Sequence, residues 1–395
     1  MKRVVITGVY AESAAGSCLE EMHELALSNR TGLEHKDTYK HLGLEKYPIG
    51  TLDCEEDNFE ENPVEEKTHK LLRKAILGAL KDANLSRDDL KNEAYTTGLS
   101  IASSTLKVLK MQEYARRKVQ GKKNIPSLLT GDSFLHYMAS LLGIKGEAYN
   151  TSIACASSTA AVGLAFDAIA DGSMKKMFVA SADPLTELSM AGFHILQTLN
   201  EEVCKPFDSN RNGINLGEAS VAFLLEEYES AVERKAKIYG EILGYSIAND
   251  AYSPTAPDPE GKGALYVMKK TLEQGNVPVE KVGYVNAHGT GTKLNDSMEY
   301  KALESLGFEG IVTSTKSLTG HCLATAGAIE LAFCIIFGLK NKVPATYNLK
   351  DSEFKGGKVK IPVNEISPLN SPYILSNSFG FGGNSSSVLI KIGEP

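Results

Sequence analysis

The sequence predicts a large α/β protein built from two similar halves. Strand-like and helix-like segments alternate along the chain, which is typical of α/β folds with buried sheets. The chain has 395 residues, more than a single hydrophobic core usually serves, so two domains or two halves of one double-sized domain are expected. A faint internal repeat favours duplication, because a shift of 166 residues places Cys155 on His321 and Thr159 on Thr325.

The first half, which we place at residues 1–236, opens with "KRVVITGV", an apolar run ended by a turn and typical of a buried strand. "VEEKTHKLLRKAILGALKDANL" has apolar residues spaced by three and four, which predicts an amphipathic helix. We expect strands at 2–9, 96–104 and 174–183, helices at 16–29 and 64–85, a basic helix and loop at 106–124, a short strand running into a helix at 151–172, a strand running into a helix at 220–236, and irregular chain at 34–63.

The second half, residues 237–395, repeats this alternation. Its helix at 321–341 is apolar nearly all round, which indicates a buried position. We expect a strand at 237–250, strand and loop at 283–292, a helix at 295–307, strand and loop at 310–320, and two strands around a glycine turn at 373–392. In a duplicated fold the helices after Cys155 and His321 would start near a pseudo-twofold centre, which would bring these two residues together.

Composition excludes several classes of protein. A net charge of −7 disfavours nucleic-acid binding. The six cysteines are scattered without a CxxC pair, so no zinc or redox motif is indicated, and a reducing cytoplasm is expected. We expect no apolar run to reach the roughly 18 residues that a membrane span needs, and the N-terminus lacks the apolar core of a signal peptide. The first strand lacks the G-x-G-x-x-G of dinucleotide-binding proteins, since Gly16 is the next glycine after Gly8.

Cys155 has two interpretations from its surroundings. Cysteine is among the most buried residue types and often only fills space. Cys155 also directly precedes the helix that begins "ASSTAAVG", where the helix dipole would stabilise a thiolate and small side chains would allow other backbone to approach.

Two histidines stand in glycine-bearing contexts downstream. His288 ends an apolar strand in "NAHGTGTKLND", and the loop after it has the room and the threonine hydroxyls to admit an extended ligand, without the ending of a phosphate-binding P-loop. His321, in "KSLTGH", precedes another helix, where the dipole favours the neutral imidazole. Two neutral imidazoles could each donate one N–H to an oxyanion or enolate. A metal site would need a third ligand at a suitable spacing, and the sequence shows none.

Charged and aromatic residues near these histidines remain open from the pattern alone. Lys316 is either a surface ammonium or part of the site. Asp296 and Glu299, three residues apart on a helix, are either a solvated pair or an acidic anchor for Lys316 or a histidine. The aromatics of "NSFGFGGNSSS" alternate with glycine, as a mobile gate would require.

These segments together resemble the β-ketoacyl-[acyl-carrier-protein] synthases of the thiolase superfamily, in particular the elongating, Cys-His-His kind. The resemblance covers essentially the whole chain and keeps the order of six motifs. The matching segments are "ACASST" around Cys155, "PFDSNRNGINLGEA" at 206–219, "NDAYSPTAPDPEGKG" at 249–263, "NAHGTGTKLND" around His288, "KSLTGH" with Lys316 and His321, and "NSFGFGGN" at 377–384.

The resemblance implies a thiolase-like fold of duplicated βαβαβαββ halves in five αβαβα layers, usually a homodimer. It implies a decarboxylative condensation of a Cys155-bound acyl group with malonyl-acyl-carrier protein, in fatty-acid or polyketide synthesis. No metal or cofactor is implied, since phosphopantetheine arrives on the carrier. The implied roles are Cys155 as nucleophile, the backbone N–H groups of Cys155 and Phe381 as oxyanion hole, His288 and His321 as enolate stabilisers, Lys316 and Glu299 as their support, Thr290 and Thr292 as ligands of the pantetheine arm, Asp296 and Phe379 as further substrate contacts, and Phe381 as gate.

The motifs also separate this chain from its superfamily neighbours. A degradative thiolase would carry a second cysteine near "SFGFGGN", and initiating synthases would have asparagine in place of His321. A non-catalytic chain-length partner would lack Cys155. Thr325, Ser220 and the segment "SSTLKVLKMQEYARR" depart from the residues usual in the family, so a role in primary metabolism and one in secondary metabolism both stay open. A Cys155-dependent acyltransferase or hydrolase is the remaining alternative.

An acidic carrier protein would need a local basic patch, because the chain itself is acidic overall. The resemblance places Lys122, Lys123 and Arg211 near the tunnel mouth. A helix with Lys67, Lys70 and Arg73 is a further candidate for this docking surface.

Overall fold

The computed structural model describes residues 1–54, 67–106, 108–121 and 133–393. Within them the first half supplies the five strands β1 (Val4–Ser13), β2 (Thr97–Ala102), β3 (Ala148–Thr151), β4 (Lys176–Asp183) and β5 (Ala219–Glu227). Its helices are α1 (Leu19–Leu27), η1 (Asp37–Leu42), α2 (Lys67–Asp82), α3 (Arg87–Asn92), α4 (Val108–Val119), α5 (Ser133–Leu142), α6 (Ser157–Ala170), α7 (Glu187–Ile195) and α8 (Tyr228–Glu233).

The second half repeats this plan. Its main strands are β6 (Gly240–Asn249), β7 (Val282–Asn286), β8 (Ile311–Thr313), β11 (Tyr373–Gly380) and β12 (Asn384–Ile392), with β9 (Val343–Pro344) and β10 (Ile366–Ser367) as a small separate pair. Its helices are α9 (Lys262–Gly275), η2 (Val279–Lys281), α10 (Lys293–Leu306), α11 (Lys316–Thr319), η3 (Leu323–Thr325), α12 (Ala326–Lys340) and η4 (Phe381–Gly383).

The strand order shows the duplication directly. The large sheet of the described residues runs β3-β2-β4-β5-β1-β6-β12-β11-β7-β8, so the second half repeats the order of the first in reverse. In each half the inner pairs (β1·β5 and β4·β5, β6·β12 and β11·β12) are antiparallel, and the outer pairs are parallel. β1 and β6 pair over only three positions. There the five strands of the first half (the upper leaf of the sheet) meet the five strands of the second half (the lower leaf).

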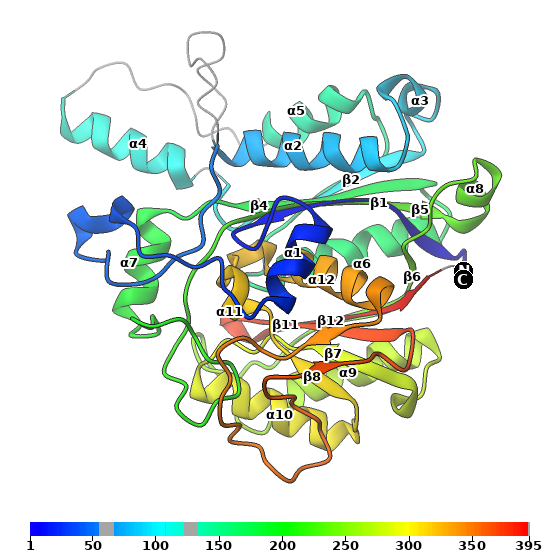
Figure 1. Ribbon diagram of the computed structural model, residues 1–395. Helices are drawn as coiled ribbons and strands as arrows, with labels where there is room; N and C mark the ends of the chain where they lie inside the picture. The colour runs from blue at the N-terminus through cyan, green and yellow to red at the C-terminus, as the bar shows by residue number, and fades with distance from the viewer. Residues whose placement is uncertain (55–66, 107, 122–132, 394–395) are drawn as a thin grey trace.

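The elements stack in five layers, α-β-α-β-α, from top to bottom of Figure 1. Helices α2 and α5 cover the upper leaf, α6 and α12 lie between the leaves, and α9 and α10 cover the lower leaf. Strand β1 is buried along nearly its whole length because helices pack on both of its faces. The predicted thiolase-like fold is therefore confirmed, whereas the boundary between residues 236 and 237 stays a prediction.

The two central helices approach closely because their facing residues are small. A Cβ added at Gly327 of α12 would lie 2.0 Å from Thr159 Oγ1 of α6, so only glycine allows this contact. Both helices are buried on nearly all sides. The loops that precede them, which carry Cys155 and His321, consequently meet at the centre of the molecule, as the duplication predicted.

The sequence prediction was wrong or incomplete in several places. It missed α3, α5, α7 and α9, because short helices and helices flanked by long loops give weak periodicity. Residues Leu323–Lys340 are also long and apolar enough to cross a membrane, contrary to the expectation that no run reached that length. Because 83% of this segment is buried between the two leaves, it is the central helix of the core.

Candidate active site

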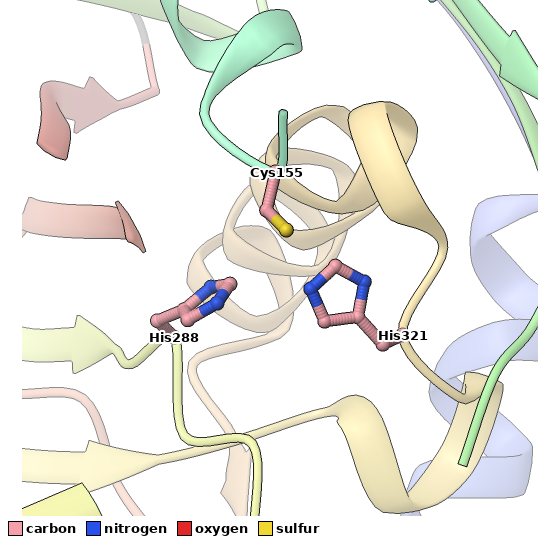
Figure 2. Close-up of side chains that lie close together, drawn as sticks. All are labelled: Cys155, His288 and His321. Carbon is pink, nitrogen blue, oxygen red and sulfur yellow. The ribbon is translucent and has the colours of Figure 1, made fainter. Parts of the chain in front are cut away.

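Cys155 stands at a strained turn between β3 and α6. Ala154 adopts φ 51°, a left-handed conformation that costs a non-glycine residue energy and that occurs where the surrounding structure enforces it. The Ser157 hydroxyl enforces it here, since it accepts the Ile153 N–H and donates to the Ala154 carbonyl oxygen. The turn aims the sulfur of Cys155 at two imidazole rings, as Figure 2 shows.

Burial dominates the acidity of Cys155. The side chain is nearly inaccessible, and desolvation raises the pKa of its thiol to about 11. The charge of Lys316 and the backbone N–H groups of Phe381 and Cys155 lower this pKa, but not enough to offset burial. The N–H of Cys155, at the turn before α6, lowers this pKa as expected for the start of a helix, but burial outweighs it and favours the thiol form.

His288 is held from behind by Lys316. Its ring lies beyond the end of β7, and the Lys316 ammonium is 3.2 Å from Nδ1 and 2.5 Å from the His288 carbonyl oxygen. An ammonium only donates hydrogen bonds, so Nδ1 is the acceptor and the ring proton lies on Nε2. His288 therefore presents an N–H on the side away from Lys316.

His321 reaches the same state by a different contact. Its Nδ1 accepts the N–H of Leu323 at 2.9 Å, which again leaves the proton on Nε2. The backbone of His321 is fixed by hydrogen bonds with Asn215 and Gly217. Leu323 has φ 50°, so the turn that supplies this amide is itself held in a left-handed conformation.

The two imidazoles are neutral and face the thiol. Desolvation is the main cause that holds the pKa of each ring well below its usual value, and the charge of Lys316 adds to it. The rings meet edge to face with centroids 5.3 Å apart, and one ring nitrogen of each lies within 4.8 Å of the other and of the Cys155 sulfur. Two N–H donors and one nucleophile thus surround a single small space.

Lys316 can be buried because its charge is paired with Glu330, a residue that was not predicted from the sequence. Glu330 of α12 accepts a hydrogen bond from the Lys316 ammonium, and both side chains are 1% exposed. Burial raises the pKa of the Glu330 carboxyl to about 7, while Lys316 acts against this shift. The available signal was Glu330 itself, a lone acidic residue inside the apolar segment "AGAIELAFCIIFG".

Glu299 and Asp296 hold His288 and the loop after it by accepting backbone N–H groups. Glu299 accepts the N–H groups of His288 and Gly289, so it anchors the histidine through the backbone rather than through Lys316. Asp296 accepts the N–H groups of Thr290 and Gly291. Both carboxylates are fully buried, and Asp296 lies behind the loop, outside the lining of the pocket where the sequence placed it.

A pocket leads from the surface to Cys155. Thr290 and Thr292 line it, with their hydroxyl oxygens 2.9 Å apart, as expected for residues along an entering chain. Phe379 and Phe381 also line it, and the ring of Phe379 is 5.9 Å from His288. Phe193 of α7 faces Phe381 at 5.6 Å; the sequence analysis missed it together with its helix.

The proposed docking residues do not form one surface in the described residues. Arg211 is 1% exposed and hydrogen-bonds to Thr292, Lys293 and Ser297, so its assignment to a carrier-docking surface does not fit its position. It forms ion pairs with Glu353 and, at 3.5 Å, with Asp296 instead. Lys122 and Lys123 lie outside the described residues.

The cluster of Cys155, His288 and His321 has the composition of a metal site, with three potential ligand atoms close together. A metal at the two Nε2 atoms would require protons on both Nδ1 atoms. Those protons would point at the Lys316 ammonium and the Leu323 N–H, which are donors themselves. The geometry suits a pair of hydrogen-bond donors better than a metal, and the absence of a metal stays a prediction.

The comparisons with known proteins point to one family. The sequence profile of the β-ketoacyl synthase N-terminal domain matches residues 1–231, and that of the C-terminal domain matches residues 239–350. The 3-oxoacyl-[acyl-carrier-protein] synthase 2 of Staphylococcus aureus (strain N315) is 32% identical over 419 residues, which cover 99% of this chain and 98% of that protein. Its counterpart in Vibrio cholerae is 31% identical and covers 99% of both chains.

Solved structures of similar proteins span the whole fold. The ketosynthase AntDE in complex with the type II polyketide acyl-carrier protein AntF matches with a TM-score of 0.89 at 27% identity, over 99% of this chain and 100% of that one. A β-ketoacyl synthase from Burkholderia phymatum STM815 matches with a TM-score of 0.89 at 26% identity, over the full length of both chains.

Proposed function

Because this chain belongs to the β-ketoacyl synthase family, we propose that it joins a Cys155-bound acyl group to a malonyl unit on acyl-carrier protein. The reaction forms a carbon–carbon bond, releases carbon dioxide and yields a 3-ketoacyl chain two carbons longer. One observation carries this proposal at the level of residues: two neutral imidazoles, each with its proton on Nε2, face the same space beside a buried thiol.

The first step is acyl transfer to Cys155. The thiol loses its proton, the sulfur attacks the thioester carbonyl carbon, and the carrier thiolate leaves and takes up a proton. The backbone N–H groups of Cys155 and Phe381 point toward the sulfur, so they are close to the oxygen of the tetrahedral intermediate. Since the thiol has a raised pKa, this step should accelerate as the pH rises.

The second step is decarboxylation of the malonyl thioester. The carbon–carboxylate bond breaks, carbon dioxide leaves, and its electron pair becomes an enolate on the thioester. His288 and His321 donate their Nε2–H groups to the enolate oxygen, and a neutral donor suits this task because it need not transfer its proton. The enolate carbon then attacks the Cys155 thioester, and the sulfur leaves as a thiolate.

Further residues receive roles under the same proposal. Thr290 and Thr292 hydrogen-bond the pantetheine arm along the pocket, and Phe381 with Phe193 opens and closes its inner end. Lys122 and Lys123, with Lys67, Lys70 and Arg73, contribute positive charge to the docking of an acidic carrier. We also propose a homodimer in the cytoplasm; the six free cysteines suit a reducing compartment.

The alternatives fit the site less well. A chain-length partner without catalysis has no use for the arrangement of Cys155, His288 and His321. A simple acyltransferase or hydrolase would use Cys155 but would leave a second neutral imidazole donor unexplained. The similar proteins act in both fatty-acid and polyketide synthesis, so the proposal covers both pathways.

Intact-protein mass spectrometry after incubation with a panel of acyl-carrier thioesters tests the proposal. We expect an adduct whose mass reports the acyl chain, and no adduct in Cys155→Ala. Malonyl-carrier decarboxylation should be lost in the double variant His288→Ala/His321→Ala. An adduct that persists in Cys155→Ala would overturn the nucleophile, and decarboxylation that survives the double substitution would overturn the enolate site.

A further inference from the structure

A buried carboxylate at the end of β4 holds the turn that carries His321. Asp183, the last residue of β4, has no exposed surface. Six donor groups reach its two oxygens: the hydroxyls of Ser103, Ser104 and Thr105 and the backbone N–H groups of Ser104, Thr105 and Ala324. A buried charge with this many donors is fixed in place, because losing any one bond leaves a polar group unsatisfied.

One of these donors belongs to the active site. Ala324 lies in η3, three residues after His321, and its N–H reaches Asp183 Oδ2 at 3.0 Å. The preceding residue, Leu323, supplies the N–H that His321 Nδ1 accepts. Asp183 thus holds the amide next to the one that decides which ring nitrogen of His321 carries the proton.

The turn needs such an anchor because it is strained. Leu323 is buried and adopts φ 50°, a left-handed conformation that a residue with a bulky side chain rarely adopts. Left to itself, the turn would relax to negative φ and rotate the Leu323 N–H away from His321. A second contact from the same strand strengthens the anchor, since the hydroxyls of Ser181 and Thr325 lie 2.9 Å apart.

We infer that Asp183 is a positioning residue for His321, acting through Ala324 and the strained Leu323 turn. It keeps the Leu323 amide aimed at His321 Nδ1 and thereby keeps the Nε2–H aimed at the space beside Cys155. This inference rests on the proposed function, in which His321 serves decarboxylation but not acyl loading. Ser103, Ser104 and Thr105 complete the carboxylate's shell on the other side and tie the turn to the loop that follows β2.

Because His321 serves decarboxylation but not acyl loading, separate measurements of these two steps test the inference. Asp183→Asn keeps the side-chain shape but replaces one acceptor oxygen with a donor, so it cannot satisfy the same six groups. Ala324→Pro removes the N–H at residue 324 and leaves the Asp183 side chain and its other donors in place, while its ring also restricts the backbone of Leu323 before it. For both variants we expect malonyl-carrier decarboxylation to fall about 10- to 100-fold, as small misplacements of a catalytic group do. Acyl loading of Cys155 should stay within about 3-fold of wild type, because its donors lie elsewhere.

Asp82→Asn is the matched control. Asp82 also accepts a backbone N–H, from Val9, together with the Tyr239 hydroxyl, at a site away from His321. We expect its loss to leave the ratio of decarboxylation to loading unchanged. If Asp183→Asn does not fold, Ala324→Pro alone decides the outcome.

Two results would overturn the inference while leaving the proposed function intact: wild-type decarboxylation in the Ala324→Pro protein, or an equal loss of loading and decarboxylation, which is what a purely structural role predicts. A wild-type protein that neither loads nor decarboxylates would overturn the proposed function and the inference together.

Discussion

The ammonium of Lys316 lies against both the ring and the backbone carbonyl of His288, with its Nζ 3.2 Å from Nδ1 and 2.5 Å from the carbonyl oxygen. Lys316 therefore sets which nitrogen of His288 is protonated, and it fixes the position of this residue together with Glu299, which accepts the His288 N–H. Because Glu330 balances the charge of Lys316, the His288 ring depends on a buried ion pair. Stability and catalysis at this point are coupled, but substitutions can separate them.

Lys316→Met should damage both properties. It leaves Glu330 buried without its cation, which should lower the free energy of unfolding by about 3–5 kcal/mol in a urea titration. It also frees the His288 tautomer and should slow decarboxylation about 100-fold. The double variant Lys316→Met/Glu330→Gln should recover most of the stability but not the activity. Lys270→Met, which removes an exposed ion pair with Glu273, is the control and should change neither. Wild-type decarboxylation in the double variant would show that Lys316 does not set the tautomer.

Cys155 should behave as an unusually weak acid. Since its pKa is raised to about 11, the thiolate fraction should grow about tenfold per pH unit from pH 7 to pH 10. Brief pulses of iodoacetamide, followed by peptide mass spectrometry, measure the alkylation rate at this one residue. Free cysteine, with a pKa of about 8.5, should level off above about pH 9 and serves as the reference. A plateau for Cys155 at or below that pH would mean that donors in the site outweigh burial.

The sequence pointed to Cys155, His288 and His321, which the structure brings together, and to Lys316 and Glu299 beside them, but not to Glu330 or Asp183. Cys155, His288 and His321 could be predicted because each lies in a short motif whose residue types are dictated by chemistry. Glu330 and Asp183 act across contacts between α12, α11, η3 and β4, and such contacts leave no local pattern in the chain. Arg211 was predicted to lie on a docking surface but is buried. An arginine in a polar motif resembles a surface cation, and only the packing around it reveals its burial. The duplicated fold was predictable because its strands and its two all-apolar helices are long segments with strong patterns.

His321 should make the protein less stable in acid. In the unfolded chain the imidazole takes up a proton near pH 6.5, whereas in the folded protein burial keeps it neutral, so the unfolded state gains protons as the pH falls. The free energy of unfolding contributed by this group should therefore fall by about 2 kcal/mol between pH 7 and pH 5. Urea titrations of wild type and His321→Gln at pH 7 and pH 5 measure this loss. Glu299 and Glu330 contribute with the opposite sign, but equally in both proteins, so their contributions cancel when the two losses are subtracted. Equal losses in the two proteins would show that His321 is charged in the folded state.

Gly327→Ala should push the two central helices apart. The added Cβ would lie 2.0 Å from Thr159 Oγ1 and 2.8 Å from Ser378 Oγ, so α12 must shift away from α6 and β11. Overpacking of this kind costs about 1–3 kcal/mol, and calorimetry or urea titration should show the loss. Because the loops before the two helices carry Cys155 and His321, the proposed catalytic residues, condensation should also slow, as a carrier-based product assay would record.

A second-site change tests this reasoning at the same contact. Thr159→Ala removes the hydroxyl that the new methyl group would strike, so Gly327→Ala/Thr159→Ala should regain both stability and condensation relative to Gly327→Ala alone. Gly192→Ala on α7 is the control, because nothing lies within 4 Å of its added Cβ. If Gly327→Ala were destabilised while its condensation rate stayed at wild type, the spacing of α6 and α12 would not set the distance between Cys155 and His321. Parallel loss and parallel recovery of stability and activity would show that the glycine contact between two buried helices fixes the geometry of the reacting groups.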